Sequence, residues 1–208
     1  MDMLEEWFLI VREQYKQVSW LEGIGVCFGI TEVLFAKCNK VWLYPCGLIS
    51  ISITAYLYFD VRLYAEILLQ VYYFVMSVYG WVLWSKRKGT GLNVSYSTTR
   101  EWMISIGIVI GSWNILYLFL HFTNSDVPVW DSLVSAFAWA GMWLLAKRKV
   151  ENWIFLNISN LIAIPLLIHK GLFLYSLLTI FLFIIAVFGY FDWKRIIDFH
   201  RNKLIKIN

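Results

Sequence analysis

The sequence is poor in charge: Asp, Glu, Lys and Arg make up only 15% of its 208 residues. Soluble domains average about 25% of these residues. Hydrophobic residues make up 60% of the chain and aromatic residues 19%. A water-soluble protein is therefore excluded, and a single-domain integral membrane protein, spanning residues 1–208, is expected.

The sequence also lacks the patterns of an enzyme or a metal site. Its three histidines are scattered, with no second ligand at metal-binding spacing. It contains no G-x-S-x-G motif and no glycine-rich phosphate loop. Cys27, Cys38 and Cys46 have no metal-ligand spacing and are expected to be free, buried thiols. We expect no catalytic residues, no metal and no cofactor.

A cleavable signal peptide is not indicated either, because the N-terminal segment is acidic at its start and lacks a small-residue cleavage site. Leu4, Trp7, Phe8 and Val11 follow a helical spacing. They predict a short amphipathic helix that lies on the membrane surface.

What the sequence does contain is seven hydrophobic segments, each long enough to cross a bilayer as a helix. They run over Trp20–Ala36, Trp42–Phe59, Leu63–Trp84, Trp102–Phe122, Val129–Ala146, Trp153–Ile168 and Leu172–Phe191. Basic residues concentrate in alternate loops and in the C-terminal tail. Because basic loops stay in the cytoplasm, the N-terminus is expected outside and the C-terminus inside.

The first three segments resemble the last three. AKCNKVW (Ala36 to Trp42) corresponds to AKRKVENW (Ala146 to Trp153), and each triplet ends in a glycine, aromatics and a basic pair. The predicted fold class is therefore all-α with two parallel three-helix repeats, about residues 20–86 and 129–195. A linker helix at about 102–122 joins them, as in transporters of the SWEET type.

Polar and aromatic side chains lie at membrane depth on two of these segments. Gln70, Tyr73 and Ser77 share one helical face, Trp153, Asn157 and Asn160 share another, and Tyr175 opens the last segment. Such stripes suit a flat, hydrogen-bonding solute. The alternative is that the amides bond neighbouring helices and the Trp and Tyr side chains form interfacial belts.

At these positions the sequence resembles the PnuC family of bacterial vitamin transporters. The resemblance rests on LQVYYFVMSVYGWVLW (Leu69 to Trp84), the pair Asp131-Ser132, RKVENW (Arg148 to Trp153) with Asn160, KGL and LY (Lys170 to Tyr175), and GYFDW (Gly189 to Trp193). It implies uptake of nicotinamide riboside by facilitated diffusion, a homotrimer in the lipid bilayer, and a cytosolic kinase that traps the product.

The resemblance also implies a binding site. Its residues would be Gln70, Tyr73, Trp81, Trp84, Asn152, Trp153 and Asn160; Asn157 and Tyr175 are added from their positions. One departure is Leu156, where nicotinamide riboside transporters of the family carry a second Trp. Thiamine or riboflavin therefore stays open as the substrate, and a cation such as thiamine could use the remaining rings.

Two other functions are consistent with the pattern. A SWEET-like sugar transporter would have the same architecture but fewer stacking aromatics. A non-transporting scaffold or receptor would use Gln70 and Asn160 for stability only.

Overall fold

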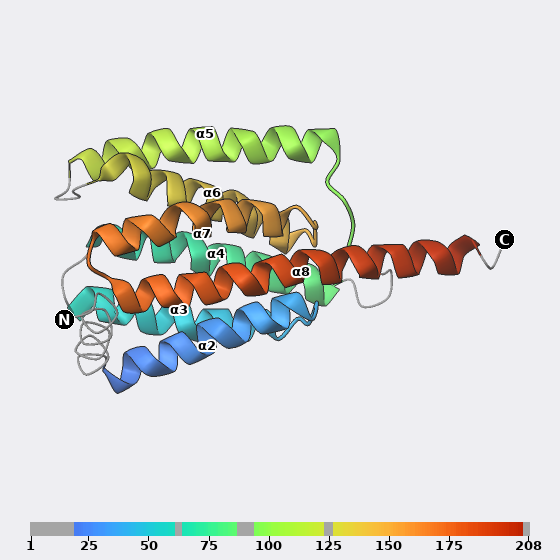
Figure 1. Ribbon diagram of the computed structural model, residues 1–208, viewed down its shortest axis with the longest axis horizontal. Coiled ribbons are helices and arrows are strands. Elements are labelled where there is room, and N and C mark those ends of the chain that lie inside the picture. The colour runs from blue at the N-terminus through green and yellow to red at the C-terminus, as the bar shows by residue number, and fades with distance from the viewer. Residues whose placement is uncertain (1–18, 61–63, 87–93, 123–126, 206–208) are drawn as a thin grey trace, which may run out of the picture.

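The structure of the protein, a computed structural model, describes residues 19–60, 64–86, 94–122 and 127–205. This part contains seven helices (Figure 1): α2 (Trp20–Lys37), α3 (Leu43–Asp60), α4 (Tyr64–Lys86), α5 (Thr99–His121), α6 (Pro128–Ala146), α7 (Asn152–His169) and α8 (Phe173–Ile205). The predicted all-α class is confirmed. The predicted surface helix near residues 4–11 lies outside the described residues.

Four of the helices, α5 to α8, are long and apolar enough by length and composition to cross a membrane. The other three contain 18, 18 and 23 residues, or about 27 to 35 Å of helix. Polar side chains and glycines in these three helices lower their mean hydropathy. The helices are nevertheless long enough to cross a membrane. Each predicted segment corresponds to one of the seven helices.

Two boundaries differ from the predictions by three residues or more. Helix α5 begins three residues early because Thr98 and Glu101 form a capping box, which satisfies two free N–H groups. Helix α8 was expected to end at Phe191 but continues to Ile205. No proline or glycine interrupts that stretch, and Ile196 and Ile197 still pack on the core. In Figure 1 the end of α8 projects beyond the other helices.

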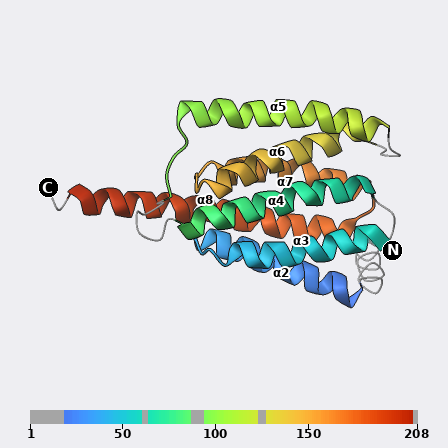
Figure 2. The ribbon, with the colours of Figure 1, turned by 180° about the vertical axis from the view of Figure 1, so that it is seen from behind.

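Six of the helices form a closed ring. Contacts follow the order α2–α3–α4–α6–α7–α8 and return to α2, while α5 packs on the outside of α6. Figure 2 shows α4 between α3 and α6 on the rear face. The two triplets therefore meet twice, each time through the first helix of one triplet and the third helix of the other. This equivalence is the one expected of two parallel repeats.

The same kind of hydrogen bond, from a Trp indole to a carbonyl at a helix end, occurs at both meeting points. The Trp84 indole of α4 donates to the carbonyl of Ala146, at the end of α6, at 3.0 Å. The Trp193 indole of α8 donates to the carbonyl of Ala36, near the end of α2, at 2.9 Å. Both rings are almost fully buried. Each indole thus donates to a carbonyl at a helix end, where the helix itself supplies no partner; the Ala36 carbonyl also accepts the Asn39 N–H, at 2.9 Å.

The segment before α5 is attached to the turn between α6 and α7. Ser97 donates its backbone N–H to both carboxylate oxygens of Glu151, at 3.0 and 2.9 Å, and its hydroxyl to one of them at 2.7 Å. Ser95 pairs with this turn through an isolated β-bridge to Lys149. The carboxylate is buried and accepts three hydrogen bonds, so it fixes the position of Ser97 and the start of α5.

The cysteines are free, as expected, but the prediction that they are buried is wrong for all three. Cys27 and Cys38 are exposed and Cys46 is intermediate. A small, weakly polar side chain is tolerated on the outside of a helix that faces lipid. Burial in a protein core is therefore not needed to accommodate these residues.

Candidate functional site

The ring of six helices encloses a central cavity of about 330 Å³. Small-molecule sites typically measure about 300–1,000 Å³. All six helices contribute to its lining: Glu32, Val33 and Ala36 of α2, Ile51 of α3, Tyr73 of α4, Ala138, Met142 and Leu145 of α6, Trp153, Leu156 and Asn160 of α7, and Leu182 and Ala186 of α8. The lining is mostly apolar, with a few polar groups from different helices.

Three of the predicted site residues, Tyr73, Trp153 and Asn160, meet in this cavity. They come from α4 and α7, the two helices that carry the predicted polar stripes. The arrangement brings two aromatic rings and one amide to a single space. It can stack a flat ring and hydrogen-bond a polar substituent on it.

Trp153 is held in place by its packing. Its ring lies edge-on to Trp193 at 5.6 Å between centroids, and Gly189 lies against its benzene ring, where a Cβ would come within 2.7 Å. Its Nε1 is buried and has no hydrogen-bond partner among the described residues. A buried donor of this kind is costly unless a ligand or water satisfies it.

Leu156, the departure from the family pattern, lies in the wall of the central cavity. Its side chain packs against the α6 backbone at Gly141, where a Cβ would come within 2.8 Å of it. The second Trp ring that the family pattern has at this position is therefore absent from the wall of the central cavity. The remaining rings of the lining are those of Tyr73 and Trp153.

Three predicted residues on α4 do not line the central cavity. Gln70 is half-buried and lies one turn from Tyr73 on the same helical face. Trp81 points outward, with 41% of its surface exposed. Trp84 belongs to the core, packed edge-on against Tyr44 at 5.3 Å.

A cation lies over one face of the buried Trp84 ring. The guanidinium of Arg148, in the turn between α6 and α7, lies 3.9 Å from the centre of the ring. Burial lowers the pKa of Arg148, and the charge interaction with Tyr44 opposes this shift. Trp84 is therefore occupied on its indole nitrogen and on one face by the protein itself.

The two other predicted amides on α7 have different surroundings. Asn152 is fully buried and donates through Nδ2 to the Lys149 carbonyl at 2.6 Å, so it organises the turn before α7. Asn157 lines a separate apolar pocket of about 320 Å³ between α7 and α8, beside Trp153. The Asn157 Oδ1 atom is buried without a hydrogen-bond partner in the described part of the chain.

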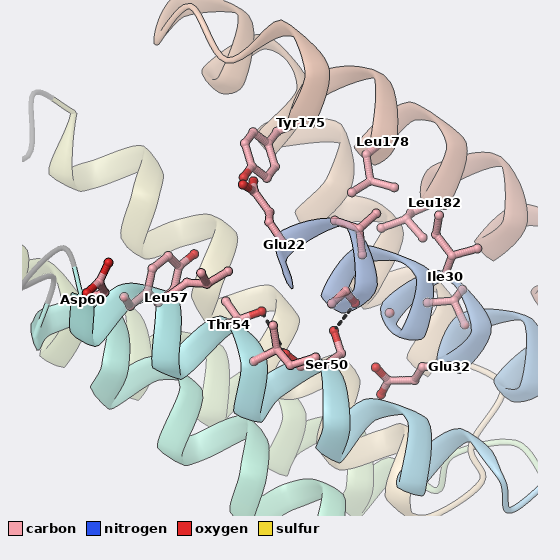
Figure 3. Close-up of a pocket in the computed structure, with 16 residues that line it drawn as sticks. Glu22, Ile30, Glu32, Ser50, Thr54, Leu57, Asp60, Tyr175, Leu178 and Leu182 are labelled. Carbon is pink, nitrogen blue, oxygen red and sulfur yellow. Dashed lines mark hydrogen bonds between the residues drawn. The ribbon is translucent and has the colours of Figure 1, made fainter. Parts of the chain in front are cut away.

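A second, outer cavity of about 570 Å³ lies between α2, α3 and α8. Tyr175 lines it, as Figure 3 shows, together with Glu22 and Asp60. Ser50, deeper in this cavity, donates to the Gly25 carbonyl at 2.8 Å and so joins α3 to α2.

The two cavities share part of their walls. Glu32, Val33 and Leu182 line both of them. A solute that entered the outer cavity would therefore meet these residues before it reached Tyr73 and Trp153. The two cavities together form a candidate pathway through the bundle.

Sequence reasoning missed Glu32. The signal that could have found it is its position: it lies inside the first hydrophobic segment, 12 residues from Trp20 and five from Lys37. Charged residues inside membrane segments usually face a cavity. Among the described residues, no cluster of three His, Cys, Asp or Glu side chains could hold a metal ion.

Comparisons with known proteins agree with this architecture. Residues 19–195 match the family model described as nicotinamide mononucleotide transporter. The nicotinamide riboside transporter PnuC of Escherichia coli K12 is 27% identical over 204 residues, 85% of each chain. That of Neisseria mucosa is 24% identical and covers 89% of this chain and 76% of the relative.

One solved structure, described as the crystal structure of the vitamin B3 transporter PnuC, has the same fold. The TM-score is 0.73 at 22% sequence identity, over 96% of this chain and 94% of the other. The similarity covers the six-helix ring and α5 together.

Proposed function

The chain belongs to the nicotinamide mononucleotide transporter family and is a vitamin transporter of a bacterial membrane, and from this premise we propose that it carries nicotinamide riboside by facilitated diffusion. The observation that carries the proposal is the central cavity, where Tyr73, Trp153 and Asn160 converge. The rings suit the flat pyridinium ring, and the amide suits the carboxamide or the ribose hydroxyls. An apolar cavity without a catalytic constellation suits translocation rather than reaction.

The direction of the chain through the membrane follows from its charges. Lys37, Lys147 and Lys149 lie at the end of the bundle from which α8 projects, together with the basic residues of α8 itself. Under the positive-inside rule this end faces the cytoplasm. The N-terminus then lies outside, and the outer cavity opens toward the outside.

Assembly and trapping follow from the family resemblance. The proposed unit is a homotrimer with one pathway in each protomer, and a cytosolic kinase phosphorylates the imported vitamin so that it cannot leave. Several large apolar side chains of α5 are exposed, among them Met103, Ile110 and Ile115. These side chains are available to contact lipid or a neighbouring protomer.

Thiamine is the second candidate substrate. The observation that favours it is Leu156, which removes one stacking ring from the cavity wall. Such a ring contributes about 0.5–1.5 kcal/mol beyond its buried area. Thiamine is a cation and would interact with the remaining rings through cation–π contacts.

Calorimetric titration of the purified full-length protein with nicotinamide riboside, thiamine and riboflavin tests the proposal. We expect micromolar or tighter binding of nicotinamide riboside. Trp153→Ala should abolish it, whereas Trp42→Ala, which removes a ring that is 63% exposed outside both cavities, should leave it unchanged. Binding of thiamine alone would transfer the proposal to thiamine. Binding of none of the three would refute it.

A further inference from the structure

We propose that Glu32 is the specificity-determining residue for charge: its carboxylate makes the pathway selective for a solute that carries a positively charged ring. The inference rests on the proposed function, because it assigns the charge preference of the same pathway. It goes further in naming a residue outside the aromatic and amide groups, one that brings a full negative charge that those groups do not carry.

The first support is position. Glu32 lies where the outer and central cavities meet and lines both. Figure 3 shows it at the inner end of the outer cavity, beyond Ser50, whereas Asp60 and Tyr175 lie toward the other end. A solute that moves between the cavities must therefore pass the carboxylate.

The second support is the packing around the side chain. The backbone of α3 approaches it at Gly47, where a Cβ would lie 2.5 Å from the Oε1 atom of Glu32. Gly47 is itself buried. A residue with any side chain at position 47 would displace the carboxylate, so the glycine keeps the space in which it lies.

The third support is that the carboxylate lacks a counter-charge. In the part of the chain that the structure describes, the ion pairs are Lys37–Asp192, Lys147–Glu101, Lys149–Glu101, Lys170–Asp131 and Arg195–Asp192, none of which includes Glu32. The described charged residues that line the two cavities are Glu22, Glu32 and Asp60. All three are acidic.

A carboxylate removed from water is costly unless it is paired or hydrogen-bonded. A residue kept for helix–helix adhesion would bond a neighbouring helix, which Glu32 does not do among the described residues. A monocation in the pathway supplies the missing partner, and the acidic lining of the outer cavity raises the local concentration of cations. A pyridinium or thiazolium ring with this charge can still stack on Tyr73 and Trp153.

The experiment compares a charged and a neutral form of one ligand. Nicotinamide riboside carries a pyridinium ring, and its reduced dihydropyridine form is neutral with the same ribose and carboxamide. Both are titrated calorimetrically, beside thiamine as a second cation, into the full-length wild-type protein, Glu32→Gln, and Asp198→Asn as a control. Asp198 is exposed on the projecting end of α8. Its replacement by Asn changes the net charge by the same amount as Glu32→Gln.

For the wild type and for Asp198→Asn we expect a preference for the cation over its neutral form of about tenfold or more, since losing one partner of a desolvated charge pair has a large effect on affinity. In Glu32→Gln this ratio should fall at least several-fold, mainly through weaker cation binding, and the cation–π contacts of the rings account for the preference that remains. Glu32→Asp, which keeps the charge, should retain most of the preference. If Glu32→Gln does not fold, Gly47→Ala, whose Cβ would displace the Glu32 carboxylate, should lower the same ratio, and an unchanged ratio in that variant would overturn the inference.

An unchanged ratio in Glu32→Gln, or equal wild-type affinity for both forms, would overturn the inference and leave the proposed function standing. Wild-type binding of thiamine but not of nicotinamide riboside, weakened in Glu32→Gln, would support the inference and refute that substrate. Binding of none of the ligands would refute both.

Discussion

Replacing Gly189 of α8 by alanine should disturb the central cavity without changing any residue that lines it. A Cβ at this position would lie 2.7 Å from two atoms of the Trp153 benzene ring and 2.8 Å from a third. Overpacking of this kind costs about 1–3 kcal/mol. Alanine regains about 0.5–1 kcal/mol in helix propensity. We therefore expect a net loss of up to about 2.5 kcal/mol in the free energy of unfolding.

The assay is thermal unfolding in detergent together with substrate binding. For a chain of this size the net loss lowers the melting temperature by up to about 10 °C. Affinity should fall as well, because Trp153 must move. Gly111→Ala on α5 is the matched control, since its Cβ would meet nothing within 4 Å. This variant should be unchanged or slightly more stable and should bind normally.

Trp153→Phe provides the decisive second variant, because a phenyl ring lacks the outer part of the indole that the new methyl group would contact. Combined with Gly189→Ala it should lose less stability than the two single effects add up to, as residues in direct contact are coupled. Strict additivity in this double-mutant cycle would show that the ring and the glycine are not in contact, and would refute the reasoning.

Three further predictions concern the rest of the bundle. Trp84→Phe and Trp193→Phe should each lower the free energy of unfolding by about 1–3 kcal/mol, measured by thermal melts, because each removes the indole donor from helix-end carbonyls, that of Ala146 in one case and those of Ala36 and Lys37 in the other; one variant far worse than the other would contradict their equivalence. Glu151→Ala removes the acceptor of three hydrogen bonds from Ser97, so it should speed proteolysis of the α4–α5 linker, followed by gel electrophoresis, while Glu151→Asp should be cleaved more slowly than Glu151→Ala. Lys170→Met breaks a partly exposed ion pair and should change the free energy of unfolding by at most about 1 kcal/mol; a larger loss would mean that this pair holds α6 to the turn before α8.

Composition and hydrophobic length predicted the seven helices and the fold class, because every membrane helix must satisfy its backbone bonds internally and bury an apolar segment. Helix ends were less predictable. The capping box at Thr98 was readable as T-x-x-E, but it lies in a polar stretch that hydropathy assigns to the loop. The start of α5 is therefore set by hydrogen bonding rather than by hydrophobicity.

The site was predictable only in part. Tyr73, Trp153 and Asn160 face one cavity, whereas Trp81 and Trp84 of the same motif face outward and into the core. The spacing of residues along one helix determines which of them share a face. Which face meets the cavity depends on the neighbouring helices. Glu32 was missed in part for the same reason, since its place between the two cavities depends on α3 and α8 as much as on its own helix.

The reciprocal bonds of Trp84 and Trp193 also bear on how such a chain can evolve. If the two triplets descend from a duplicated gene, neither copy can drift alone, because each completes a helix end in the other. Loss of the tryptophan in one half exposes a defect in the opposite half, at Ala146 or Ala36. Selection therefore acts on the two halves as one unit, and the end of the bundle where both bonds lie should change most slowly between descendants.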